Sequence, residues 1–133
     1  MQFYWMHTSM KPYRFAAFLA LSLLVACADQ SPPGPGILTA TLKSPHGAEG
    51  AALVVLMGSG IGEVTPVGRN QLYSSSNLDE VRIVLVNQHD GTLAFRVEVA
   101  DTTIEPVAIV EEVADPGNRL RPTVDGYALE FRR

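Results

Sequence analysis

Residues 92–99 read TLAFRVEV, and this stretch decides the fold of the chain. Its large apolar side chains, Leu93, Phe95, Val97 and Val99, occupy every second position, and polar or small residues fill the positions between them. Alternation over eight residues is typical of a β-strand that turns one face to a hydrophobic core and the other to solvent. We therefore expect the neighbouring segments to supply further strands and a second layer over this apolar face.

Short segments of the same character follow one another from residue 37 to residue 133. We expect them to form strands at 37–43, 51–57, 64–67, 71–74, 81–87, 106–115 and 127–131. Residues 51–57, AALVVLM, are continuously apolar, which predicts a central strand covered on both faces. Residues 106–115 fit a helix or a strand, and we interpret them as a strand because β-branched residues dominate the first half. Pro66 indicates that the strand around it lies at a sheet edge.

Turn residues separate these segments. Asp90-Gly91 predicts a hairpin between 81–87 and 92–99, because this residue pair suits the tight turns of hairpins. Residues 115–118, DPGN, predict another turn. Seven to eight short strands at intervals of about 8 to 12 residues, with no convincing helix, predict an all-β fold, a single antiparallel β-sandwich over residues 37–133.

The N-terminal part has the character of an export signal. Lys11 and Arg14 supply positive charge ahead of residues 15–25, an uncharged and almost wholly apolar run. The length of this run suits a secretory signal and falls short of the roughly 20 apolar residues that a membrane-spanning helix needs. Met10, directly before Lys11, is the start of translation that we favour, and the earlier start leaves the same signal.

The apolar run ends in the tetrad Leu24-Val25-Ala26-Cys27, which resembles the lipobox of bacterial lipoproteins. The resemblance implies cleavage between Ala26 and Cys27 and attachment of lipid to Cys27, the only cysteine in the sequence. It divides the chain into a cleaved signal peptide at 1–26, a lipidated cysteine with a tether at 27–36, and the sandwich at 37–133. Two other interpretations are an ordinary secretory signal cut after Ala26 and a lone buried cysteine.

The residues after Cys27 bear on location. The lipobox resemblance implies that membrane lipid holds the mature protein in a bacterial cell envelope. Ala28 stands where aspartate retains such proteins in the inner membrane, so we expect the outer membrane rather than the inner one. Residues 28–36, ADQSPPGPG, form a Pro- and Gly-rich tether that extends over about 25–30 Å.

The mature part is acidic. The full sequence has a net charge of −4, and removal of Lys11 and Arg14 leaves eight basic against fourteen acidic side chains, a net charge of −6. This balance argues against nucleic acid as a partner, because nucleic acid requires clustered Lys and Arg. A single cysteine cannot form a disulfide within the chain, so hydrophobic burial must hold the domain together.

Three segments bear a resemblance to Ig-like and cohesin-like sandwiches of exported bacterial proteins. They are residues 50–55 (GAALVV), 91–97 (GTLAFRV) and 126–131 (GYALEF). The chain is also similar to small lipoproteins that combine a lipobox, a Pro-rich tether and a sandwich. The resemblance implies the fold, and no residue here carries over the dockerin partner of cohesins.

Arg119 and Arg121 are the first candidates for ligand contact. They place two guanidinium groups on one side of a short extended segment, where they could grip a carboxylate or an acidic glycan. They could also pair with Glu111 and Glu112 across a strand, and we favour this pairing. Tyr73 is a third candidate for ligand contact.

The sequence nominates no catalytic set and no metal site. His46, His89, Glu49 and Asp90 match no known ligand spacing. Residues 58–62, GSGIG, lack the lysine and the following helix of a phosphate-binding loop, and we expect a turn there. We therefore expect no metal, no cofactor and no enzyme activity.

These observations favour a non-catalytic binding or assembly module of the envelope. We expect it to be anchored through acylated Cys27 and to meet another envelope protein through strand edges or loops. The alternative is a lipoprotein that binds a small ligand or a glycan, with Arg119, Arg121 and Tyr73 as its contacts. A hydrolase is the third and least favoured class. The sequence leaves the oligomeric state open.

Overall fold

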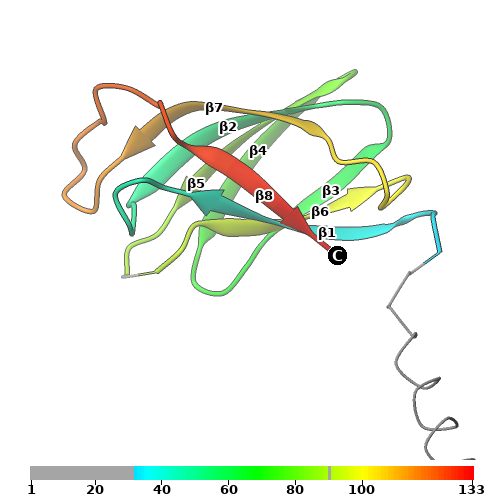
Figure 1. Ribbon diagram of the computed structural model, residues 1–133, viewed down its shortest axis with the longest axis horizontal. Coiled ribbons are helices and arrows are strands. Elements are labelled where there is room, and N and C mark those ends of the chain that lie inside the picture. The colour runs from blue at the N-terminus through cyan, green and yellow to red at the C-terminus, as the bar shows by residue number, and fades with distance from the viewer. Residues whose placement is uncertain (1–31, 90) are drawn as a thin grey trace, which may run out of the picture. The chain divides into compact units, whose positions relative to one another are not determined.

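The computed structural model describes residues 32–133 apart from residue 90, and this part of the chain forms two four-stranded antiparallel sheets (Figure 1). The strands are β1 (Gly36–Lys43), β2 (Ala51–Met57), β3 (Ile61–Pro66), β4 (Gln71–Asn77), β5 (Glu80–Val86), β6 (Ala94–Val99), β7 (Val107–Ala114) and β8 (Ala128–Arg132). The first sheet has the order β3-β6-β1-β8 and the second has the order β4-β5-β2-β7. The predicted all-β sandwich is confirmed.

The apolar layer lies between the two sheets. Phe95, Val97 and Leu93 are at most 2% exposed, whereas Arg96 and Glu98 face solvent, as the alternation in the sequence predicts. The second sheet contributes its own inward row, and the remaining core members from both sheets are Leu38, Ala40, Leu42, Ala52, Val54, Leu56, Val81, Ile83, Leu85, Val99 and Val113. Burial of these side chains is the main favourable term in folding.

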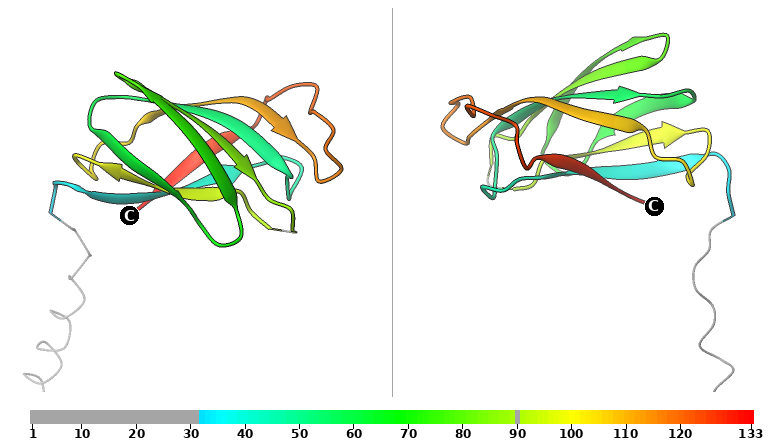
Figure 2. Two further views of the ribbon diagram at one scale, coloured as in Figure 1. Left: turned by 180° about the vertical axis from the view of Figure 1, so that it is seen from behind. Right: turned by 45° about the horizontal axis from the view of Figure 1, so that its top comes forward.

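Four pairs of consecutive strands lie opposite one another across the sandwich. The two strand orders place β3 opposite β4, β6 opposite β5, β1 opposite β2 and β8 opposite β7, and the edge strands β7 and β8 approach each other (Figure 2). Six of the seven connections therefore cross from one sheet to the other. The exception is the tight turn between β4 and β5, which are hydrogen-bonded neighbours.

The predicted hairpin at Asp90-Gly91 is wrong. β5 pairs with β4 and β2 in the second sheet, whereas β6 pairs with β1 and β3 in the first, so residues 87–93 cross between the sheets. Asp90 itself lies outside the described residues. The physical reason is that Ile83 and Phe95, both fully buried, belong to opposite walls of one core. Sheet membership follows this non-local packing and overrides the local turn preference.

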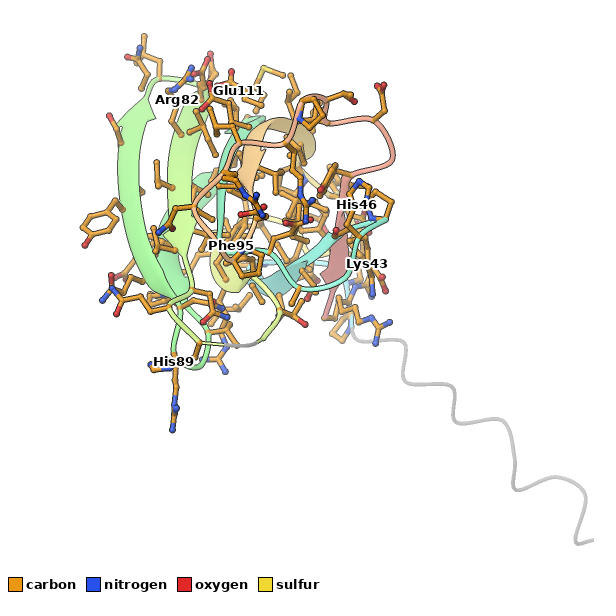
Figure 3. All side chains as sticks on the ribbon, turned by 90° about the vertical axis from the view of Figure 1, so that its left-hand side faces the viewer. Lys43, His46, Arg82, His89, Phe95 and Glu111 are labelled. Carbon is orange, nitrogen blue, oxygen red and sulfur yellow. The ribbon has the colours of Figure 1, made fainter. Side chains whose placement is uncertain are left out.

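Residues 51–57 form a central strand as predicted, but a second layer covers only one of its faces. On the outer face Leu53 and Met57 are half-buried, while Val55 is 3% exposed. Arg82 on β5 and Glu111 on β7 form an ion pair across β2 (Figure 3). Arg82 lies directly opposite Val55 in the register of the two strands. The alkyl part of such a pair shields the strand beneath it. The first sheet therefore covers the inner face of β2, and neighbouring side chains of the same sheet cover its outer face.

The interpretation of residues 106–115 as a strand is confirmed. Val107–Ala114 is β7, and its register against β2 shifts between Leu53 and Val54. The shift is a β-bulge, in which two residues of β7 lie opposite one residue of β2. Pro66 is confirmed as an edge residue, because it ends β3 at the margin of the first sheet.

The sandwich has two ends, which we name after Gly36 and Glu49. At the Gly36 end Thr102 donates its N–H to the Gly34 carbonyl at 2.9 Å, and Arg133 Nε donates to the Thr102 carbonyl at 3.0 Å. At the Glu49 end the N–H of Gly50 donates to the Ala114 carbonyl at 2.8 Å. The start of β1 and the last residue thus share one end, and the loops around Glu49 form the other.

We predict that Phe95→Ala lowers the free energy of unfolding by about 3–5 kcal/mol, because it removes a large ring from a fully enclosed site. Urea unfolding of the purified variant and wild type measures this difference. Tyr73→Ala is the matched control, since Tyr73 is 62% exposed. Its expected effect is within about 0.5 kcal/mol. Equal losses from the two substitutions would contradict the described core.

Candidate functional site

The most buried charged side chain in the described residues is that of Glu49, in the loop between β1 and β2. Glu49 is 3% exposed although both of its neighbours are small residues of a surface loop. Gly50 allows this path, because a Cβ there would lie 2.5 Å from the carbonyl oxygen of Asp115. The β1–β2 loop and the segment after β7 therefore lie in close contact, and Glu49 is buried beneath that segment.

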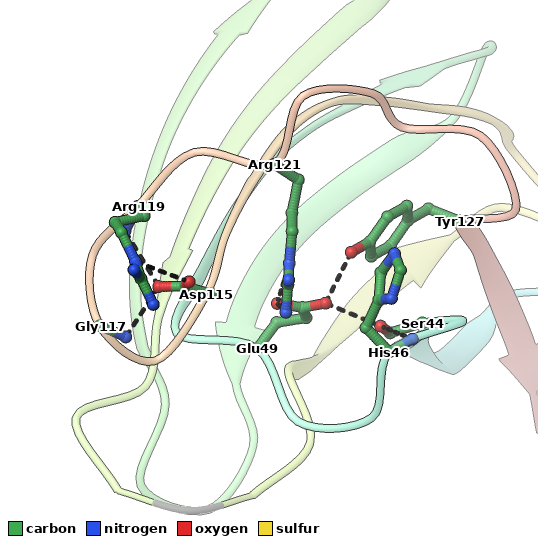
Figure 4. A network of polar contacts seen from close by, with 8 residues as sticks. All are labelled: Ser44, His46, Glu49, Asp115, Gly117, Arg119, Arg121 and Tyr127. Carbon is green, nitrogen blue, oxygen red and sulfur yellow. Dashed lines mark hydrogen bonds and ion pairs between the residues drawn. The ribbon is translucent and has the colours of Figure 1, made fainter.

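Both carboxylate oxygens of Glu49 accept hydrogen bonds from three separate parts of the chain (Figure 4). Oε1 accepts from Ser44 Oγ at 2.8 Å and from Tyr127 Oη at 2.6 Å. Oε2 accepts from Arg121 Nε at 3.2 Å and from Arg121 Nη2 at 3.1 Å. We call these four residues the Glu49 clamp. It fastens the loop after β1 to the segment after β7 and to the entry of β8.

The clamp favours one protonation state for Glu49 and one for Tyr127. Burial alone raises the pKa of Glu49, but the hydrogen bonds from Tyr127, Ser44 and Arg121, together with the Arg121 charge, hold that pKa below its ordinary value of 4.5. Burial and the adjacent carboxylate raise the pKa of Tyr127 above 10.0, so the phenol stays protonated. Glu49 is therefore an ionised and weakly basic group at neutral pH, suited to holding loops rather than to accepting protons.

Arg119 is held in a separate turn. Asp115 Oδ1 accepts from the N–H of Gly117 at 2.8 Å and from the N–H of Arg119 at 3.0 Å, and Asp115 Oδ2 accepts from Arg119 Nε at 3.2 Å. The side chain of Arg119 is 84% exposed. Asn118 occupies the left-handed region of this turn, with φ of 63°. Sequence reasoning located the turn at residues 115–118 but did not foresee its ion pair.

The pairing of Arg119 and Arg121 with Glu111 and Glu112 is wrong. Arg119 binds Asp115, Arg121 binds Glu49, and Glu111 binds Arg82. The reason is the course of the chain after β7. Residues 119–121 fold back along the end of that strand, where the Arg121 N–H donates to the Val113 carbonyl at 2.8 Å. This return points Arg121 toward the Glu49 loop.

The three candidates for ligand contact do not share one site. Arg121 lies beside the end of β7, while Tyr73 lies on β4 at the opposite edge of the same sheet. Arg119 and Arg121 are each turned toward an acid of their own. Ala26 and Cys27, the predicted cleavage and lipidation residues, lie outside the described part of the chain.

The histidines are also apart. The ring of His46 lies 6.0 Å from that of Tyr127, at the rim of the Glu49 clamp, whereas the N–H of His89 donates to Asn87 Oδ1 in the crossing after β5. Among residues 32–89 and 91–133, no three His, Cys, Asp or Glu side chains gather closely enough to hold a metal ion.

In the same residues no helix is long and apolar enough to cross a membrane. The turn expected at residues 58–62 is confined to residues 58–60, because β3 begins at Ile61.

Two open hollows flank the Glu49 clamp. One, of about 460 Å³, is lined by the Glu49 loop, by residues 86–89 and by Pro116 and Asn118. The other, of about 410 Å³, lies between the same loop and residues 41–44 and 91–93. The Glu49 carboxylate is enclosed by its partners, so it presents no free charge to either hollow.

Comparison of the chain with family models, curated proteins and solved structures gives no match.

Sequence reasoning missed the role of Glu49, which it weighed only as a metal ligand. It also missed Asn70, whose Nδ2 donates to the carbonyls of Val67 and Ala94 at 2.9 and 3.0 Å and so fixes the crossing from β3 to β4. A signal for Glu49 is its place between small residues directly before a wholly apolar strand. Its partners Arg121 and Tyr127 lie 72 and 78 residues away, so no local pattern indicates them.

We predict that Glu49→Gln lowers the free energy of unfolding at neutral pH by about 1–3 kcal/mol, because it leaves Arg121 without its buried anion. The penalty shrinks as the pH falls below 4.5. The pKa of Glu49 is lowered by folding, so its charge stabilises the fold above that value and the stabilisation is lost as Glu49 takes up a proton. Urea unfolding across this pH range measures both effects.

Glu112→Gln is the matched control for this prediction. Glu112 is an exposed acid of β7, and its loss should change the free energy of unfolding by less than about 0.5 kcal/mol both at neutral pH and in acid. A Glu49→Gln penalty that grows on acidification would show that the carboxylate is not held in its ionised form.

Proposed function

We propose that this protein is a lipid-anchored protein of the bacterial envelope whose sandwich is a non-catalytic binding module. The observation that carries the proposal is an order of segments. The apolar run at 15–25 ends in the lipobox-like tetrad at Cys27, a Pro- and Gly-rich tether follows, and β1 begins at Gly36, the last residue of that tether. Each segment has the length and composition that its role in an anchored protein requires.

Acylation of Cys27 explains why the chain carries one cysteine and places it between an export signal and a tether. A diacylglycerol with an additional acyl chain supplies more than one hydrocarbon chain, which is enough for stable anchoring. Ala28 favours the outer membrane. The tether then lets the sandwich stand clear of the lipid headgroups while remaining within about 25–30 Å of them.

The outer face of the second sheet supports a role in binding. It exposes four large apolar side chains, Tyr73 at 62%, Val84 at 39%, Ile109 at 44% and Val107 at 62%. The register places Tyr73 beside Val84 on one part of this face and Val107 beside Met57 on another, and the Arg82–Glu111 ion pair lies between the two parts. Exposed apolar groups with charged groups around them are typical of contact sites for other proteins. We call this outer face the apolar face and assign to it the contact with another envelope protein.

For the anchor we predict that Cys27→Ser moves the protein from the membrane fraction to the aqueous fraction, because the substitution removes the thiol that receives lipid. Fractionation of cells that express either form, with mass spectrometry of the N-terminal peptide, measures location and lipid together. Wild type that is found at the membrane without lipid on Cys27 would contradict the anchor and leave the binding role untouched.

For the apolar face we predict that Val84→Glu combined with Ile109→Glu abolishes cross-linking to a partner in native membranes. Two carboxylates at the centre of this face would have to be desolvated in any contact. Ile37→Glu is the matched control, because Ile37 is 52% exposed on β1 of the other sheet. Cross-linking followed by mass spectrometry gives the measurement. Equal loss from the control would refute the assignment of this face.

A further inference from the structure

β4 is an open edge of the second sheet. It pairs with β5 on one side, and no strand of the described chain pairs with its other side. All of its residues except Leu72 are exposed. Its outward row of backbone N–H and C=O groups is therefore available to another strand.

The other three edge strands carry features that oppose pairing with a second chain. β3 contains Glu63 and ends at Pro66, and its register against β6 is irregular. β7 contains the bulge and two adjacent acids. β8 has only five residues, of which Glu130 and Arg132 are charged. Charges, proline and bulges are the devices by which edge strands avoid edge-to-edge contact.

β4 has none of these features. Its sequence, QLYSSSN, contains no charged residue and no proline. All seven residues pair with β5 in an unbroken register, from Gln71 opposite Val86 to Asn77 opposite Glu80. β4 is thus a regular, neutral and exposed strand in a protein that protects its other edges.

We propose that β4 pairs antiparallel with β4 of a second copy of this chain, with Ser74 on the two-fold axis. In this register Tyr73 lies opposite Ser75 of the other copy, and Gln71 lies opposite Asn77. The two second sheets join into one eight-stranded sheet. A two-fold contact of this kind uses the same surface on both copies and closes after two chains.

Charge complementarity selects a second copy as the occupant. Arg69 stands two residues before β4 and Asp79 stands two residues after it, and both are exposed. None of the ion pairs within the described chain includes either of them. Both residues lie in the turns just beyond the ends of β4, and the proposed register places the Arg69 turn of each copy at the same end of the strand pair as the Asp79 turn of the other. Opposite charges therefore lie at both ends of a neutral strand, while the acidic surface elsewhere keeps copies apart.

Tyr73 gains a partner in the same arrangement. The two Tyr73 rings occupy diagonal positions on the outer face, where Cβ atoms lie about 7–8 Å apart and aromatic side chains reach one another. The contact covers part of a ring that is 62% exposed in the single chain. It also places the Tyr73 and Val84 side chains of both copies on one face of the joined sheet, on either side of the two-fold axis.

The pairing is independent of the lipid anchor, and a common membrane strengthens it. An edge-to-edge contact buries little surface, which makes it weak in dilute solution. Confinement of two chains to one membrane raises their effective concentration without any new contact.

The decisive experiment is disulfide cross-linking of Ser74→Cys in cells that express the full chain. Residues opposite one another in an antiparallel pair have Cα atoms about 4.5–5.5 Å apart, within the range that a disulfide spans. We expect oxidation to convert a large part of this variant to a covalent dimer. Asn77→Cys is the matched control, since residue 77 faces residue 71 of the other copy, and it should yield little dimer.

Charge reversal tests the register. In the Ser74→Cys background, Arg69→Asp or Asp79→Arg alone should cause loss of most of the dimer, because each places like charges at both ends of the strand pair. The double variant should restore it. Equal dimer from Ser74→Cys and Asn77→Cys, dimer from neither, or single reversals without effect would overturn the proposal.

Two further samples separate this proposal from that of the anchor. The unsubstituted chain reports any dimer formed through Cys27, which would show an unacylated thiol. The combination of Cys27→Ser with Ser74→Cys tests pairing without lipid. A Ser74 dimer that persists in the combination supports the pairing even where the anchor is refuted, and its absence from both Ser74→Cys samples overturns the pairing alone.

Discussion

The burial of one apolar layer between two sheets holds this protein together. A single cysteine excludes a disulfide within the chain, so the stability of the sandwich depends on side chains such as Phe95, Leu56 and Ile83 meeting across the layer. Because all consecutive strands except β4 and β5 lie in opposite sheets, the layer forms only when the chain has crossed between the sheets six times. The crossings are therefore part of the same constraint, and each must be fixed by contacts of its own.

Two buried polar side chains fix crossings at the Glu49 end. Glu49 holds the loop after β1 through three hydrogen-bonding partners, and Asn70 holds the turn before β4 through backbone carbonyls. A buried charge of this kind is costly unless its partners satisfy it completely, as they do for both Glu49 oxygens. The buried polar groups at this end thus bond to other parts of the chain and stabilise the fold, whereas the apolar side chains on the outer face of the second sheet are exposed to solvent.

The local pattern of the sequence was sufficient to predict the strands but not their partners. Alternation in residues 92–99 and the apolar run at 51–57 identified β6 and β2, because burial of one or both faces determines which residues a strand carries. The hairpin predicted at Asp90-Gly91 was wrong because a turn signal does not specify the sheet that the next strand joins. The Arg121–Glu49 pair was missed for a related reason, since its two members meet only after the sandwich has closed.

The position of β1 has a mechanical consequence. β1 lies between β6 and β8 and is hydrogen-bonded to both, over six residue pairs on one side and five on the other. The chain enters β1 at Gly36, so tension applied from the N-terminal side acts along the strand axis. Such a load shears two ladders at once, and their hydrogen bonds must fail together rather than one after another. Entry through a central strand thus makes the domain resistant to unfolding by tension on the segment that leads into β1.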